Sequence, residues 1–125
     1  KDGMIMDRYA IVIYADGRSA KLRCDDGEGL SLETLQGIVE GHIETVPAAL
    51  AQGWSGEADV SPILLVNEEG KLKGLPENEA ATECSGLLYD TIVGNAVMMG
   101  SRGEELVGFT EKAAENIMEK WSLIC

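Results

Sequence analysis

Residues 9–24, YAIVIYADGRSAKLRC, decide the fold class of this chain. The first half, Tyr9–Tyr14, is a β-branched and aromatic run of strand length. The dipeptide Asp16-Gly17 follows, and its tolerance of positive φ suits a two-residue hairpin turn. Ser19–Cys24 then alternates apolar and polar side chains, as in a strand with one solvent-facing side. The sequence therefore predicts a β-hairpin near the N-terminus.

A short helix is predicted beyond the acidic loop DDGEG at residues 25–29. Ser31 is a suitable N-cap, because its hydroxyl can accept a hydrogen bond from a free N–H of the first turn. Apolar residues recur at helical spacing from Leu32 to Val39. Gly41 is expected to end this helix, since glycine readily adopts the left-handed conformation.

Three further strands are predicted in the middle of the chain. His42–Val46 is expected to form a strand that stops at Pro47. A long connection rich in small residues follows over residues 48–62. The apolar run Ile63–Val66 is typical of a strand inside a sheet. A short partner strand is expected to begin at Lys71–Lys73.

A short helix and an interrupted strand are predicted next. Pro76 suits the start of a short helix over residues 77–83, because that position needs no backbone N–H. Ile92-Val93 and Ala96–Met99 are expected to form one strand interrupted by Gly94.

The last segment is an amphipathic helix that begins after Thr110, its expected N-cap. One apolar stripe follows helical spacing, and it consists of Ala114, Ile117, Met118, Trp121 and Cys125. The elements do not alternate regularly as in a doubly wound fold. We therefore expect one α+β domain over residues 1–125, with a mixed, mostly antiparallel sheet of about five strands.

The charge of the chain is strongly negative and unevenly distributed. Its formal net charge is −12, and residues 24–70 contain ten acidic residues and no lysine or arginine. Direct nucleic-acid binding is not expected, because phosphate contacts need cationic side chains. The acidity is compatible with a basic protein partner or divalent cations, and equally with a role in solubility alone.

Two acidic groups are candidates for binding a basic partner. The DDGEG loop could alternatively hold calcium or be an ordinary exposed loop, since it lacks the full twelve-residue EF-hand pattern. The C-terminal helix carries a ridge of like charges that either awaits a partner's cations or is a solvated face. The candidate residues are Asp25, Asp26 and Glu28 in the loop and Glu111, Glu115 and Glu119 in the ridge.

Two other features could carry function. Trp54 lies in the long connection, where it either packs the loop down or anchors an interface. His42, the single histidine, defines an alternative pocket together with Asn67, Asn78 and Tyr89. Histidine can act as a general base, but no nucleophile or second metal ligand stands near it at a recognisable spacing.

No cofactor or metal site is recognisable. The three cysteines include no CxxC pair, which argues against structural zinc and favours reduced thiols in the cytoplasm. The glycines match neither nucleotide-binding pattern. No signal peptide is recognisable, and no apolar run approaches the roughly 20 residues that cross a bilayer.

Most of the chain resembles the family catalogued as domain of unknown function 3846. The resemblance rests on LETLQGIVEGHIETV (32–46), LLVNEEGKLKGLPENEAAT (64–82), YDTIVGNAVMMG (89–100) and the final GFTEKAAENIMEKW. It implies a setting in phages, plasmids and conjugative elements of clostridia and related gut bacteria, and it implies no activity. Two departures are a longer connection over 48–62 and Glu79, where the resemblance leads us to expect a basic residue.

The sequence thus favours a non-enzymatic, cytoplasmic accessory protein of a mobile element that acts by binding another protein. Its acidic surface would imitate nucleic acid toward a basic host protein. The alternative is a small-molecule-binding domain or small enzyme with a pocket near His42. The oligomeric state and the partner are left open.

Overall fold

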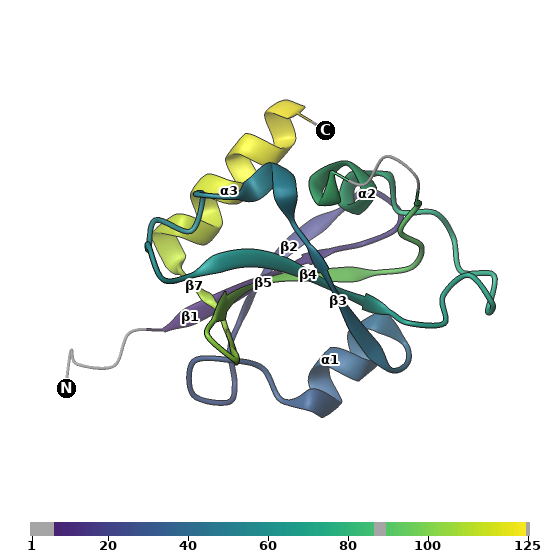
Figure 1. Cartoon of the computed structure of the whole chain (residues 1–125), viewed down its shortest axis with the longest axis horizontal. Helices are drawn as coiled ribbons and strands as arrows, with labels where there is room; N and C mark the ends of the chain where they lie inside the picture. Colours follow the sequence, from purple (N-terminus) through teal and green to yellow (C-terminus); the bar gives the residue numbers. More distant parts are fainter. Residues whose placement is uncertain (1–6, 87–89, 125) are drawn as a thin grey trace.

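An antiparallel sheet forms the centre of the computed structural model, which describes residues 7–86 and 90–124 (Figure 1). Its main path runs in the order β2 (Ser19–Arg23), β1 (Arg8–Ile13), β5 (Ala96–Arg102), β4 (Ser61–Asn67) and β3 (Ile43–Pro47). Two short strands extend it, because β6 (Glu105–Val107) pairs with β5 and β7 (Phe109–Thr110) pairs with β1. The expected α+β fold with an N-terminal hairpin is confirmed.

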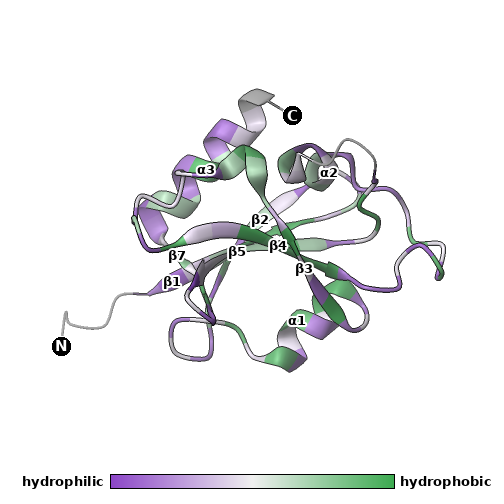
Figure 2. Ribbon diagram, viewed as in Figure 1, coloured by the Kyte–Doolittle hydropathy of each residue, from purple (hydrophilic) through white to green (hydrophobic). Residues whose placement is uncertain are grey.

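Helices cover both sides of this sheet, as Figure 1 shows. One side carries α1 (Leu32–Val39), and the other carries the 3-10 helix η2 (Ala49–Ala51), α2 (Glu79–Ser85) and α3 (Glu111–Ile124). In Figure 2 α1 and α3 each carry both apolar and hydrophilic residues, while apolar colouring runs along much of the sheet between them. The molecule therefore has three layers, referred to below by their α1 side and their α3 side.

The middle strands are apolar on both sides because each side meets a helix layer. Leu64 of β4 lies opposite Met98 of β5, and both belong to the core on the α3 side. Their neighbours Leu65 and Val97 belong to the core on the α1 side. The two-sided burial explains the continuous apolar run that marks β4 as an interior strand.

The hairpin turn differs by one residue from the predicted form. The backbone N–H of Tyr14 donates to Arg18 O at 2.9 Å, and that of Gly17 donates to Tyr14 O at 3.0 Å. Gly17 has φ +96°. This is a three-residue loop with glycine at its left-handed position, so the predicted two-residue turn was wrong.

The start of α1 is confirmed and its end is corrected. Ser31 Oγ accepts a hydrogen bond from the Thr34 N–H at 3.2 Å. At the C-terminus Glu40, not Gly41, adopts the left-handed conformation, with φ 66°. Gly41 is needed for space instead, because a Cβ there would lie 2.6 Å from Asn67 Nδ2 and 2.7 Å from Lys73 Nζ.

Two elements of the middle region were wrongly predicted. Lys71–Lys73 forms no strand but lies in consecutive turns, in which the Lys73 N–H donates to Glu69 O at 3.0 Å. Helix α2 begins at Glu79 rather than just after Pro76. Glu77 is held in an extended bridge with Val93, so the helix can start only beyond it.

The C-terminal third was predicted in outline. Ile92-Val93 is not part of β5, because Gly94 turns the chain with φ +79° before the strand begins at Ala96. β5 then runs on to Arg102 and folds back into β6 through Gly103 and one further residue. The sequence did not predict β6 and β7, which are only three and two residues long.

Helix α3 matches its prediction. The Thr110 Oγ1 atom accepts a hydrogen bond from the Ala113 N–H at 3.1 Å, which confirms the N-cap. Ala114, Ile117 and Trp121 are buried against the sheet. Cys125, the last residue of the predicted stripe, lies outside the described residues.

Candidate functional site

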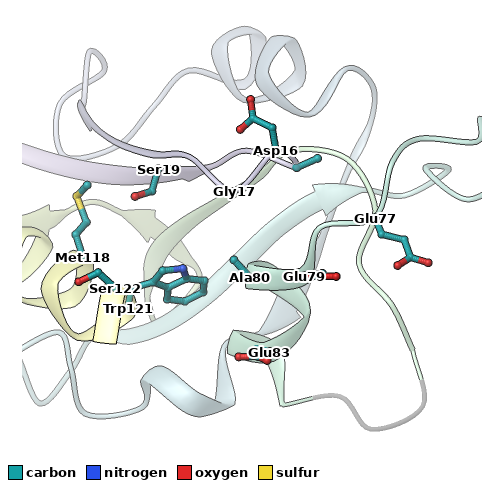
Figure 3. A pocket seen from close by; sticks show the side chains of 11 residues that line it. Asp16, Gly17, Ser19, Glu77, Glu79, Ala80, Glu83, Met118, Trp121 and Ser122 are labelled. Carbon is teal, nitrogen blue, oxygen red and sulfur yellow. The ribbon is translucent and has the colours of Figure 1, made fainter. Parts of the chain in front are cut away.

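A hollow of about 610 Å³ opens between the β1–β2 turn, α2 and the second half of α3 (Figure 3). Acidic residues from the turn, from α2 and from the segment just before α2 line it together with an apolar part, and no lysine or arginine of the described chain does so. We call this hollow the acidic groove. Its acidic residues are Asp16, Glu77, Glu79 and Glu83, and its apolar residues include Ala80, Met118 and Trp121.

One buried side chain fixes the position of this groove. Asn78 is 1% exposed, and its Nδ2 donates to the backbone oxygens of Ile13 and Gly94, both at 2.9 Å. Its Oδ1 accepts from the Ala81 N–H at 3.0 Å and so caps α2. The first turn of α2 is thereby attached to the end of β1, beside the hairpin turn.

The opposite wall comes from α3. Trp121 is 8% exposed and belongs to the core on the α3 side, and Figure 3 shows its ring extending from α3 toward Ala80 of α2. Met118 lies one turn earlier and packs against the same core. The apolar wall therefore stands on packed elements rather than on a loop.

One carboxylate of the groove, that of Asp16, is paired with an arginine of the hairpin turn. The backbone N–H of Arg18 and then its guanidinium, 2.8 Å from Asp16 Oδ2, lower the pKa of Asp16. That carboxylate is consequently ionised throughout the neutral range. Together the four lining carboxylates make an anionic hollow next to an apolar wall, a combination that suits cationic side chains with apolar stems.

Two acidic side chains of the DDGEG loop, those of Asp25 and Glu28, contact other parts of the chain. Asp25 Oδ2 accepts from the Thr34 hydroxyl at 3.3 Å, at the start of α1. Asp26 forms a tight bridge with Gly29 through its backbone. Glu28 forms ion pairs with two arginines, with Arg8 Nε at 3.7 Å and Arg102 Nη1 at 3.2 Å.

The ridge on α3 also receives a cation from within the chain. Lys21 Nζ of β2 donates to Glu111 Oε2 at 2.6 Å and to Glu115 Oε2 at 2.9 Å. These two hydrogen bonds raise the pKa of Lys21. The repulsion expected between the first two ridge residues is thus relieved by the sheet, whereas no ion pair of the described chain includes Glu119.

The two predicted acidic groups do not form one surface. Asp25 lies beside the N-terminus of α1, and Glu111–Glu119 lies on α3, on the other side of the sheet (Figure 1). A single array made of both groups is therefore not present.

Trp54 is half-buried and packs against the core on the α3 side. Lys120 Nζ of α3 lies 5.4 Å from the centre of its ring. Trp54 thus packs the long connection onto the core, and its role as an interface anchor stays a prediction.

The described residues of the alternative pocket, His42, Asn67 and Asn78, do not line one common hollow. The His42 side chain is 76% exposed, and its Nδ1 lies 3.4 Å from Glu68 Oε1. Asn67 is buried and donates to Val39 O at 3.0 Å. A hollow of about 250 Å³ is lined by Asn67 but by neither His42 nor Asn78. Tyr89 lies outside the described residues.

An ion-pair network that the sequence did not indicate attaches β1 to the long connection. Arg8 donates to both carboxylate oxygens of Glu57, at 2.6 and 2.9 Å. The hydrogen bond from Arg8 is the main reason that the pKa of Glu57 is lowered. The 49 residues between the partners explain why no local pattern reveals this contact.

Residues 7–86 and 90–124 include two buried cysteines and no group of side chains placed to bind a metal ion. No three or more histidine, cysteine, aspartate or glutamate side chains in that part are placed to share a metal ion. Cys24 and Cys84 are buried, and burial raises the pKa of the Cys24 thiol to about 11. None of the helices described has the length and apolar character to span a bilayer.

The groove residues were not recognised from the sequence as one site. Met118 and Trp121 were assigned to the core, and Asp16 to the turn. Glu77, Glu79 and Glu83 lie close together in the sequence around α2. Only the tertiary structure brings them to the same hollow as residues of α3.

Comparison with known proteins identifies the family of the chain but no activity. No match was found among curated proteins or among solved structures. The model of one family matches residues 8–122, which includes all the strands and nearly all of α3. The chain therefore belongs to the family described as domain of unknown function (DUF3846).

Proposed function

We propose that this chain is a non-enzymatic protein that acts by binding a basic segment of another protein in the acidic groove. The observation that carries the proposal is the hollow of about 610 Å³ that four acidic residues line together with an apolar wall. Carboxylates attract lysine and arginine heads, while Trp121 and Met118 offer contact to their aliphatic stems.

The size of the groove indicates what kind of segment it accepts. Its volume lies within the range of about 300–1,000 Å³ typical of sites for small ligands. A few side chains of a peptide fill such a volume, whereas a folded domain would contact mainly the rim. The proposed ligand is therefore a short cationic stretch of a partner protein.

The family resemblance and the net charge support a proposal for where this protein acts and on what kind of target. We propose a cytoplasmic accessory protein of a mobile element whose target is a basic nucleic-acid-binding protein of the host. A net charge of −12 supports steering toward such a target. The acidic groove takes the place of the divided Asp25 and Glu111 groups as the surface that imitates phosphates.

A peptide titration tests the groove. Hexalysine, hexaarginine and hexaglutamate are titrated into the protein while tryptophan fluorescence and heat are recorded. Neutralising the groove with Glu77→Gln and Glu79→Gln together is expected to weaken cationic peptide binding about tenfold or more, which corresponds to about 1.4 kcal/mol. The loss should shrink as salt rises, because the attraction is electrostatic.

The control changes the same amount of charge outside the groove. Glu33→Gln and Glu119→Gln together remove two exposed carboxylates from α1 and α3. Equal weakening in the groove variant and in this control would show that only net charge matters, and would contradict the proposal. Displacement of double-stranded DNA from a basic host protein by the wild type, but not by the groove variant, would support the imitation of nucleic acid.

A further inference from the structure

Strand β3 forms one edge of the sheet, and half of its backbone groups point away from the fold. Its register with β4 runs without a bulge from Ile43–Asn67 to Pro47–Ile63. The Glu68 N–H donates to His42 O at 3.0 Å. With this register, the backbone groups of Glu44 and Val46 are the ones that bond to β4. Because alternate residues of an antiparallel edge strand point outward, the free groups belong to Ile43, Thr45 and the Pro47 carbonyl.

The outward groups have no hydrogen-bond partner in the described part of the chain. Exposed strand edges are usually protected by cations, bulges or covering elements. The opposite edge, β2, follows this rule, because it carries Lys21 and Arg23 and Lys21 is attached to α3. β3 has only Pro47 at its end and no cationic residue.

Two hollows border this edge. One of about 250 Å³ is lined by Glu44 and Val46 of β3 and by carboxylates that include Glu68 and Asp90. Val46 packs on the α3 side, so this hollow lies on that side of the edge. Lys71 is the single cation lining it, and it forms an ion pair with Asp90.

The other hollow, of about 500 Å³, has a different character. Thr45 and Pro47 of β3 line it together with Ile63 and Leu106, which pack on the α1 side, and Val46 and Gln52 also contribute to it. Only one charged side chain, Glu104, contributes to it. Successive side chains of a strand point to opposite sides of the sheet, so a strand beside β3 would meet carboxylates on one side and apolar groups on the other.

We propose that the β3 edge binds an extended segment of a partner protein in which basic and apolar residues alternate. The segment adds a further strand to the sheet, with its backbone bonded to Ile43 and Thr45. Its basic side chains face Glu44 and Glu68, and its apolar side chains face Ile63. Charge complementarity selects this occupant over a second copy of the chain, since two copies bring −12 against −12.

This site is separate from the acidic groove. The groove is built from the β1–β2 turn, α2 and α3, whereas β3 lies at the far edge from β2. The two proposals can therefore fail independently, and the Glu77→Gln, Glu79→Gln variant should bind a β3 ligand as the wild type does.

The test uses a synthetic peptide of six residues that alternates lysine and valine, with blocked ends. Amide hydrogen exchange is followed residue by residue with and without the peptide. We expect protection of the Ile43 and Thr45 N–H groups to rise tenfold or more at saturation, with little change at Glu44 and Val46, which are already bonded to β4. The same peptide with alternate amides N-methylated keeps its charge and should not protect them.

Two variants distinguish pairing from charge. Thr45→Pro removes an outward N–H without removing a bond to β4, and it should weaken peptide binding at least tenfold, while Thr45→Val should not. Glu44→Lys with Glu68→Lys should reverse the preference toward a peptide that alternates glutamate and valine. Both variants are checked for an unchanged amide spectrum elsewhere in the sheet.

Three results would overturn the inference. Equal binding of the N-methylated peptide would mean that the backbone edge is not used. Unchanged exchange at Ile43 and Thr45 under saturation would place the peptide elsewhere. Sedimentation of the free protein as an oligomer that Thr45→Pro dissociates would assign the edge to a second copy.

Discussion

A single buried amide, that of Asn78, connects three parts of this molecule. It caps α2, and it supplies donors to the carbonyls of Ile13 and Gly94, two buried residues. Buried polar groups left without partners are costly, so this residue stabilises more than its own helix.

We predict that Asn78→Ala lowers the free energy of unfolding by about 2–4 kcal/mol, from the lost cap and the unpaired carbonyls together. Ser31→Ala is the matched control, because it removes the cap of α1 and a hydrogen bond to the Thr34 hydroxyl in the same turn, and it should cost about 1 kcal/mol. Urea unfolding followed by circular dichroism measures both. Similar losses for the two variants would show that the inward hydrogen bonds of Asn78 add nothing.

The sequence revealed residue roles only where the partners are local. The cap roles of Ser31 and Thr110 can be predicted because the N–H groups that donate to their side chains lie only three residues away. Asn78 was noticed as a pocket residue instead, since its two carbonyl partners lie 65 and 16 residues away. Because Pro76 is typical of the first turn of a helix, the predicted start of α2 lies two residues before the observed start at Glu79.

Among the elements, β2 and α3 are joined by charge as well as by packing. Lys21 bridges Glu111 and Glu115, two carboxylates one turn apart that would otherwise repel each other. The ring of Tyr9 lies under the same ammonium group, 4.9 Å from its centre.

We expect Lys21→Gln to lower the melting temperature, and to lower it more at low salt than at high salt. Removing the cation restores the repulsion on α3, and salt screens that repulsion. Lys112→Gln removes an equal charge from α3 itself, where no ion pair of the described residues includes it, and should change the melting temperature less. A shift of the same size in both variants at every salt concentration would contradict a specific bridge.

Element types followed largely from periodicity, and their contacts did not. The 3.6-residue pattern of α3 and the apolar run of β4 were clear enough to predict both. The cation that neutralises the α3 ridge comes from β2, 90 residues away along the chain. The acidic groove and the hollows beside β3 were missed for the same reason, because each combines segments that are distant in sequence.

At the scale of the whole molecule, the three layers depend on one sheet. Both cores share strands β1, β4 and β5, whose alternate residues serve opposite sides. Loss of either helix layer would therefore expose apolar residues of the same strands.

We predict that unfolding in urea is a single transition in which tryptophan fluorescence and far-ultraviolet circular dichroism coincide. Fluorescence reports on Trp54 and Trp121, both on the α3 side, while circular dichroism reports on all layers. Coincidence is expected because the shared strands couple the two cores. Separate midpoints would show that the α1 layer unfolds on its own.

The place of β1 inside the sheet has a consequence for synthesis on the ribosome. β1 is made before β5 and β7, its partners beyond β2, and Arg8 pairs with Thr110 of β7. A two-stranded hairpin is at best marginally stable alone. The nascent chain must therefore remain without its central sheet until nearly the whole domain has left the exit tunnel, and a chaperone has that interval in which to bind the waiting strand.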